Sequence, residues 1–384
     1  MTTAATSPPP SPRTAGPPWL GPVVTHRTYE RQWLIVTSAM VAAAAVFFGW
    51  RALFMVAATA VLTVAAFGVT HLALRAIRDT PPRSSLTYAV GVGLMMGLTL
   101  PLMPQIWHSV VAGILAGVLC HFIGPAQRVR IHPVAVIHLV LLLASPFTGV
   151  RGTEGVLAQS HILRGDVFHL AEPIGGPTWT RMHAPEGAEA LRREPVSRLM
   201  LQEQHRILEH SSRIVMLLRE GELPRLTDVL LGAVPGPVGA TSAALIILAG
   251  VYLMYRRIGR WPFALAAILV AAVTLALLPV QRPEGWTISL IAFTDVGWRV
   301  AVAYLSYQLL ATPLLLIVLV LAPLTLPRSP GGRLIYGFLI GGGVVIFRWI
   351  APYEGIAYLA LVAASILCPV LDRVHHSPFV RPRA

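Results

Sequence analysis

The chain has few charged residues and little cysteine. Charged side chains make up only 12% of its 384 residues, whereas 55% are hydrophobic and the mean hydropathy is +0.67. This balance excludes an ordinary soluble domain and is typical of a protein that crosses a membrane many times. The two cysteines, Cys120 and Cys368, lie in apolar runs, which excludes a disulfide framework or a metal site built from cysteines.

Lysine is absent, so all 30 basic residues are arginine and the net charge is +13. These arginines lie largely between apolar runs, where they set membrane topology more often than they bind nucleic acid. With the N-terminus inside the cell, sixteen arginines of the tails and short loops fall on the inner side and four, Arg51, Arg282, Arg299 and Arg348, on the outer side. We therefore expect a multi-pass protein of a bacterial-type plasma membrane, with both termini cytoplasmic and no nucleic-acid partner.

Ten apolar runs predict an all-α membrane protein with about ten transmembrane helices in two five-helix repeats. Several runs are shorter than the roughly 20 residues that a straight span needs, so tilted or broken helices are expected. The predicted organisation is a disordered cytoplasmic tail (1–30), a first repeat (31–147), an external loop with an amphipathic helix (148–225), a second repeat (226–374) and a cytoplasmic tail (375–384). The runs are 34–50, 52–75, 86–103, 107–124, 132–147, 226–255, 261–280, 299–321, 333–350 and 354–372.

A short internal repeat supports the two halves. Leu98-Thr99-Leu100-Pro101 recurs as Leu324-Thr325-Leu326-Pro327, each time at the end of an apolar run. The next run carries two glycines four residues apart, Gly113 and Gly117 in one half and Gly337 and Gly341 in the other. Small residues at this spacing allow two helices to pack closely, so we interpret the pattern as an internal duplication.

The sixth apolar run is broken by glycine and proline between 232 and 243. A helix interrupted at membrane depth exposes backbone N–H groups that a ligand or a neighbouring chain must satisfy. Gly236, Gly239, Thr241 and Ser242 are therefore candidate cofactor-binding residues, since hydroxyls and N–H groups at a helix start suit anions. The alternative for the hydroxyls is helix capping and interhelical packing.

A second candidate residue is Thr312, which precedes Pro313. The alternative there is that the threonine only replaces the backbone hydrogen bond that the proline removes.

Several motifs occur in an order that resembles a known family. They are Gly236 to Ala243 followed by Gly250-Val251-Tyr252-Leu253, then Arg260-Trp261, Gly332-Arg333-Leu334-Ile335-Tyr336-Gly337, Glu354-Gly355 and Pro369-Val370-Leu371-Asp372. Over about residues 30–375 the chain resembles the membrane proteins that include the B subunit of the sodium-pumping NADH:quinone oxidoreductase and the D subunit of Rnf complexes. The resemblance implies two five-helix halves, FMN, partner membrane subunits, and electron transfer coupled to sodium or proton translocation.

The departures from the family pattern bear on its chemistry. The family's Gly-Glu-Thr-Ser is Gly239-Ala240-Thr241-Ser242 here, so a carboxylate is missing from the broken helix. Where the family carries the threonine that holds FMN, the nearest string places Glu189. The resemblance therefore implies a flavin held without a covalent bond. The competing function is a transporter or scaffold of the same fold that has lost redox chemistry.

Three histidines, His71, His121 and His138, lie inside apolar runs, where ionisable groups are uncommon and often functional. A pair could ligate a b-type haem. Neutral histidines bonded to helix carbonyls are more usual, and no second-half run carries a partner, so we expect no haem. Tryptophans near the ends of the runs, including Trp33 and Trp261, are expected to be interfacial anchors.

Overall fold

The computed structural model describes the protein as nearly all helical. The residues described are 26–48, 50–78, 84–100, 107–123, 131–144, 226–231, 239–240, 242–282, 285–288, 290–291, 298–310, 313–350 and 354–373. The helices before residue 150 are α1 (His26–Phe48), α2 (Trp50–Arg78), α3 (Leu86–Thr99), α4 (Trp107–Phe122) and α5 (Pro133–Ala144). Those after 225 are α11 (Leu226–Leu231), α12 (Ala243–Tyr255), α13 (Trp261–Leu277), α15 (Trp298–Leu310), α16 (Pro313–Leu316), the π-helical turn η1 (Ile317–Leu321), the 3-10 turns η2 (Ala322–Leu324) and η3 (Glu354–Ile356), α17 (Pro330–Ile350) and α18 (Ala357–Arg373).

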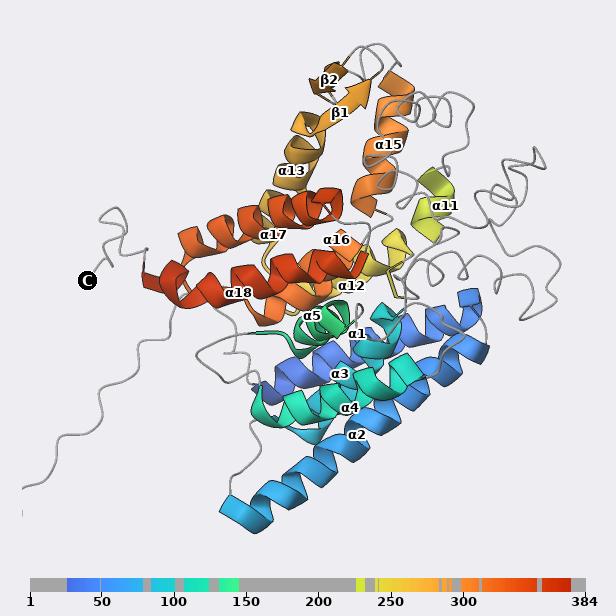
Figure 1. Ribbon diagram of the computed structural model, residues 1–384, viewed down its shortest axis with the longest axis vertical. Helices are drawn as coiled ribbons and strands as arrows, with labels where there is room; N and C mark the ends of the chain where they lie inside the picture. Colours follow the sequence, from blue (N-terminus) through green and yellow to red (C-terminus); the bar gives the residue numbers. More distant parts are fainter. Residues whose placement is uncertain are drawn as a thin grey trace, which may run out of the picture.

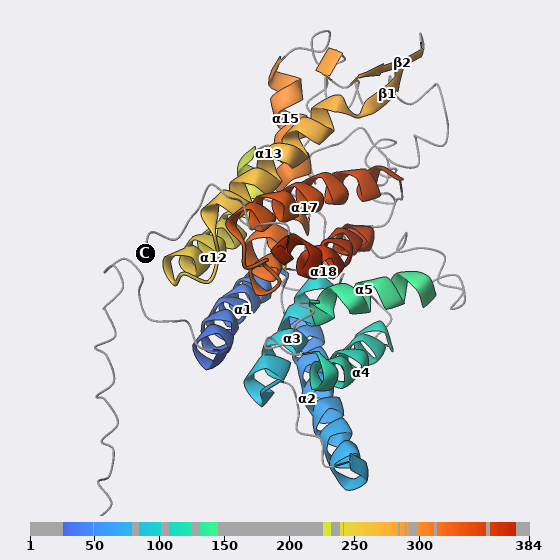
Figure 2. The same ribbon diagram turned by 90° about the vertical axis from the view of Figure 1, so that its left-hand side faces the viewer.

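The helices form two groups that follow the sequence. Helices α1 to α5, blue to green in Figure 1, lie on one side, and α12 to α18, yellow to red, lie on the other. Helix α5 runs beside α18 in both views (Figure 2), and these two helices are in contact. Contacts also join α1 to α12, so residues far apart in sequence meet between the two groups.

Two helices are long and apolar enough to cross a membrane, by length and composition. They are Ala52–Ile77 in α2 and Pro330–Arg348 in α17. Among the described residues the other apolar helices are shorter, 10–17 residues each. Short helices agree with the expectation of broken or tilted segments, while the number of ten spans stays a prediction.

Each long helix packs closely against a neighbouring helix at a pair of glycines. On α4, a Cβ added to Gly113 would lie 2.9 Å from the Thr59 carbonyl oxygen of α2, and one added to Gly117 would overlap the Thr63 carbonyl. On α17, a Cβ at Gly337 would lie 2.8 Å from the Phe263 carbonyl oxygen of α13. Both predicted glycine pairs therefore lie at close helix contacts, as small residues four apart allow.

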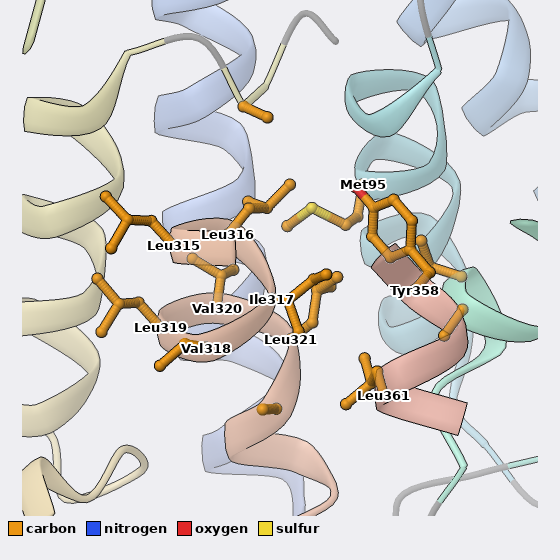
Figure 3. Close-up of a cluster of buried hydrophobic side chains, with 14 of the residues drawn as sticks. Met95, Leu315, Leu316, Ile317, Val318, Leu319, Val320, Leu321, Tyr358 and Leu361 are labelled. Carbon is orange, nitrogen blue, oxygen red and sulfur yellow. The ribbon is translucent and has the colours of Figure 1, made fainter. Parts of the chain in front are cut away.

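The segment from α16 to η2 lies at the centre of the protein. Pro313 to Ala322 are all buried, which is expected of a helix that is apolar on every side. Figure 3 shows Leu315 and Leu319 on one side of this segment, while Ile317 and Leu321 point toward Met95 of α3 and Tyr358 and Leu361 of α18. Leu319 meets Gly250 of α12, and a Cβ added to Gly250 would lie 2.8 Å from the Leu319 Cβ. The core thus joins both helix groups.

Some local features differ from the sequence-based expectation. Helix α1 begins at His26, within the segment predicted as tail, because Tyr29 already packs into the core. Residues Pro279–Arg282 and Gly285–Ile288 form an antiparallel hairpin, β1–β2, that the apolar periodicity did not reveal.

Of the predicted tryptophan anchors, Trp261 is 66% exposed, but Trp33 is 0% exposed, so that prediction is wrong. The Trp33 ring lies against Gly91 of α3, where the lack of a side chain leaves room for it.

Candidate functional site

Helix α3 ends inside the protein at the first Leu-Thr-Leu motif. Its fourteen residues rise about 21 Å, less than the roughly 30 Å hydrocarbon core of a membrane. The helix begins at Ser85, whose side chain accepts a hydrogen bond from the Tyr88 N–H, and ends with the Leu100 N–H donating to the Met96 carbonyl. Residues Leu98, Thr99 and Leu100 are all buried. The carbonyl end of α3 is therefore enclosed by protein.

The broken element of the second half lies directly on this end. The Gly239 N–H donates to the Leu98 carbonyl at 2.7 Å. A Cβ at Gly239 would lie 2.8 Å from the Leu98 Cβ, so this approach requires glycine. The segment just before α12 thus contacts the carbonyl end of α3 directly.

Ser242 begins helix α12. Its hydroxyl donates to the Leu230 carbonyl at 3.1 Å and accepts from the Leu245 N–H at 3.4 Å. The side chain therefore caps α12 and ties it to α11, the arrangement that the capping alternative anticipates. Of the candidate cofactor residues, Gly239 and Ser242 lie together here, whereas Gly236, Thr241 and Thr312 lie outside the described residues.

Thr99 connects the end of α3 to a buried histidine. Its hydroxyl donates to the Met96 carbonyl at 3.0 Å, and its oxygen lies 3.0 Å from His138 Nε2 on α5. The Thr99 hydroxyl and His138 Nε2 are thus hydrogen-bonded, and which of the two donates depends on the tautomer of the imidazole. The imidazole stacks on Tyr358 of α18, with ring centroids 4.1 Å apart and an interplanar angle of 6°. Among the described residues, His138 Nδ1 is buried without a hydrogen-bond partner.

The second Leu-Thr-Leu motif makes a similar end with different partners. The Thr325 hydroxyl donates to the Ala322 carbonyl at 3.0 Å, and its oxygen lies 2.5 Å from the Tyr336 hydroxyl. Tyr336 in turn lies 3.1 Å from the Ser365 hydroxyl. The hydroxyls of Ser365, Tyr336 and Thr325 therefore form a hydrogen-bonded chain that ends at the Ala322 carbonyl.

The family-like motifs of the C-terminal part meet at this second end. Arg333 Nε donates to the Pro327 carbonyl at 2.9 Å, and Ser329 Oγ donates to the Leu371 carbonyl at 3.1 Å. Asp372 accepts from the Arg328 N–H at 2.5 Å. Motifs some forty residues apart in sequence thus connect the start of α17 to the end of α18.

Tyr252 of the Gly250 motif joins the two helix groups. Its hydroxyl donates to Gln32 Oε1 on α1. One turn earlier on α1, Tyr29 is enclosed by protein, and burial together with Tyr88 and Glu30 raises the pKa of Tyr29 well above its ordinary value. Glu30 accepts a hydrogen bond from Ser85 Oγ at 2.5 Å. This end of α1 is therefore a hydrogen-bonded junction in which the tyrosine stays neutral at ordinary pH.

The remaining two histidines form a separate pair. His71 on α2 and His121 on α4 have ring centroids 5.9 Å apart. The helices touch one turn earlier, at Gly117, so a porphyrin between these rings would need the helices to part. The described residues contain no group of three or more His, Cys, Asp or Glu side chains that could hold a metal ion.

Arg348 was not singled out from the sequence as a buried residue. It was counted among the outer-loop arginines, but it lies in the last turn of α17, is 7% exposed and donates to Gln308 of α15 at 3.0 Å. No local pattern could reveal this, because the partner is 40 residues away.

Comparisons with known proteins place these features in a family. Residues 14–380 match the family described as NQR2, RnfD, RnfE. The chain is 28% identical to the D subunit of the ion-translocating oxidoreductase complex of Halorhodospira halophila over 96% of this chain and 94% of that protein, and 26% identical to the protein of the same name from Rhodobacter capsulatus over 86% and 81%. It is 26% identical to the B subunit of the Na⁺-translocating NADH-quinone reductase of Chromohalobacter salexigens over 38% of this chain and 33% of that protein. The chain therefore belongs to the NQR2, RnfD, RnfE family.

Proposed function

We propose that this protein is an integral membrane subunit of an ion-translocating electron-transport complex of the Rnf or Nqr type. The observation that carries the proposal is the family match over residues 14–380, together with relatives named as the D subunits of such complexes over nearly their whole length. Proteins of this kind work with other membrane subunits, so this one acts with partners in a plasma membrane and is not an autonomous enzyme.

The proposed architecture is two five-helix repeats with about ten spans and cytoplasmic termini. Two observations support the repeats: α4 contacts α2 and α17 contacts α13 through equivalent glycine pairs, and each Leu-Thr-Leu motif bonds its threonine hydroxyl to the carbonyl three residues earlier. The topology rests on the arginine bias of the short loops.

Flavin held without a covalent bond is the proposed cofactor. The described part of the candidate site does not by itself offer free donors, since Gly239 N–H and the Ser242 hydroxyl are bonded within the protein. A flavin bound there would therefore depend on Gly236, Thr241 and Thr312. Covalent attachment is not proposed, because Glu189 stands in place of the acceptor threonine.

The same contacts favour a second function, that of a transporter or scaffold protein without redox chemistry. In that case the interruption before α12 is a packed junction between the helix groups, and Gly239 and Ser242 serve only to hold it together.

A visible absorption spectrum of the protein, purified with whatever subunits accompany it, distinguishes the two functions. Bound flavin gives its characteristic absorption in the blue, which is released on denaturation, and no fluorescent band remains on a denaturing gel. A colourless protein that copurifies with no redox subunit supports the second function. A fluorescent band that disappears when one threonine or serine is changed would contradict the noncovalent mode.

The topology is tested with single cysteines in a variant lacking Cys120 and Cys368. A membrane-impermeant thiol reagent added to intact cells should label Ser160→Cys, in the predicted external segment, and spare Arg328→Cys, on the exposed turn before α17. The reverse labelling would overturn the predicted orientation.

A further inference from the structure

We propose that the turn between α12 and α13 binds the headgroup of an anionic phospholipid. Arg256, Arg257 and Arg260 lie within this turn, and all three are exposed. Neither the turn nor the two helices that it joins contain an acidic residue, so no carboxylate of this segment balances the positive charge. The inference goes beyond the proposed function, because binding a lipid requires no redox chemistry.

Hydrogen bonds to α12 hold the backbone of the turn. The Arg257 N–H donates to the Met254 carbonyl at 2.9 Å, and the Ile258 N–H donates to the Leu253 carbonyl at 2.9 Å. Among the described residues, Arg257 is the one non-glycine residue with a positive φ, 61°. This left-handed conformation suits glycine and costs energy for other residues. An arginine kept in a conformation that favours glycine indicates a use for its side chain.

The surface beside the arginines is that of a membrane interface. Tyr255 at the end of α12 is 79% exposed, and Trp261 at the start of α13 is 66% exposed. Exposed aliphatic side chains continue from both residues along the helices. They are Leu248 and Val251 on α12, and Leu265, Leu269, Val273 and Leu277 on α13. Exposed aromatic residues of membrane proteins lie at the level of the headgroups, so the arginines of the turn lie where lipid phosphates are found.

Two other helices begin at the same end of the protein. Tyr252, one turn before the arginines, is hydrogen-bonded to Gln32 in the second turn of α1. Helix α17 meets α13 first at Phe263 and then at Ala267, so these helices run parallel and begin together. The first turns of α1 and α17 carry three further arginines, Arg27, Arg31 and Arg333. Clusters of arginine at one end of membrane helices attract anionic headgroups.

The chemistry favours a phospholipid over an acidic protein segment. A guanidinium group donates two parallel hydrogen bonds to phosphate oxygens. The phosphate of a phospholipid is also attached to acyl chains, which the exposed aliphatic faces of α12 and α13 can contact. An acidic segment of a soluble partner would leave those faces uncovered.

The test is a lipid titration followed by native mass spectrometry. The protein, purified with whatever subunits accompany it and delipidated in a neutral detergent, is titrated with phosphatidylglycerol. Phosphatidylcholine with the same acyl chains is the neutral reference. The key variants replace Arg256, Arg257 and Arg260 by glutamine, singly and together. The matched control is Arg75→Gln, which removes one exposed positive charge from α2.

We expect phosphatidylglycerol to bind more tightly than phosphatidylcholine at low salt, where charges are least screened. Its affinity should fall by about fivefold for each arginine removed from the turn, whereas Arg75→Gln should bind it like the unchanged protein. Equal binding of the two lipids overturns the proposal. Unchanged phosphatidylglycerol binding by the variant without the three arginines also overturns it, and loss of a copurifying subunit in that case assigns the turn to a protein partner.

Arg257→Gly separates lipid binding from folding. Glycine adopts the left-handed conformation without strain, so the unfolding midpoint in neutral detergent should stay the same or rise while phosphatidylglycerol affinity falls. A lower midpoint with unchanged affinity would show that Arg257 serves the fold and would overturn its role in binding. The titration involves no electron transfer, so a colourless protein without redox subunits would contradict the proposed function and leave the lipid result standing.

Discussion

The two Leu-Thr-Leu ends have the same local structure and different chemistry. In both, the threonine hydroxyl donates to the carbonyl three residues earlier, at 3.0 Å. The first threonine is then hydrogen-bonded to a histidine 39 residues away, and the second to a tyrosine 11 residues away that is itself bonded to Ser365. The first end is bonded to an imidazole, and the second to a chain of hydroxyls. The repeated Leu-Thr-Leu-Pro sequence thus forms the same local hydrogen bond twice, while residues from other helices determine which side chains surround each threonine.

The largest effect is expected where both halves use the same glycine contact. Gly117→Ala and Gly341→Ala each place a methyl group into a backbone carbonyl of the facing helix, and the cost should be about 3 kcal/mol or more. Thermal unfolding followed by fluorescence size exclusion should show a much lower midpoint for both. The control is Gly68→Ala in α2, which meets nothing within 4 Å and should be neutral or slightly stabilising. Unequal losses for Gly117 and Gly341 would mean that the two halves do not rely on the contact equally.

The contact between the first end and the broken element is the next to test. Gly239→Val would force Gly239 away from Leu98, where even a Cβ lies only 2.8 Å from the leucine Cβ, at a cost of roughly 1–3 kcal/mol. Membrane insertion should persist because α12 stays apolar, while bound flavin and electron transfer should fall. A variant with normal insertion, cofactor content and activity would show that the interruption is only a packing junction.

Tyr336→Phe tests whether the hydrogen-bonded chain of Thr325, Tyr336 and Ser365 stabilises the second Leu-Thr-Leu motif. The change removes the hydroxyl that lies between Thr325 and Ser365, leaving both with an unused hydrogen-bonding capacity, and should cost about 1–2 kcal/mol. A double-mutant cycle with Ser365→Ala checks the connection, since the loss in the double variant should be less than the sum of the two single losses. If the stability losses of the two single variants simply add, Tyr336 and Ser365 do not act in one hydrogen-bonded chain.

The smallest expected effect concerns the cap of α12. Ser242→Ala removes the hydroxyl that accepts from Leu245 N–H and donates to Leu230, and should cost about 1 kcal/mol. Ser242→Thr keeps a capping hydroxyl and should melt close to the unchanged protein. If Ser242→Ala also loses flavin while Ser242→Thr keeps it, the hydroxyl has a binding role beyond the cap.

Much of the helical organisation was predictable from the sequence. The run beginning at 86 starts at the same residue as α3, and the run beginning at 261 starts at the same residue as α13, because Ser85 and Arg260-Trp261-Pro262 mark helix starts. Both glycine pairs were expected to be packing faces, and both are. These features depend on residues close in sequence, whose effect on the backbone is local.

Other features could not be obtained from the sequence. Trp33 is buried because Gly91, 58 positions later, leaves room for its ring, and Arg348 is buried because Gln308 accepts from it. The candidate site shows the same limit: Gly239 was expected to allow a close approach, but the identity of its neighbour, Leu98, came only from the structure.

The sequence by itself determined the membrane class, the family, the starts of α3 and α13 and the two glycine packing faces, because hydropathy, glycine spacing and motif order act over short distances. Only the tertiary structure decided that Thr99 meets His138 and Tyr358 while Thr325 meets Tyr336 and Ser365. The physical reason is that the protonation and binding capacity of a buried polar group depend on the partners that surround it in space, and those partners come from helices far apart in the chain.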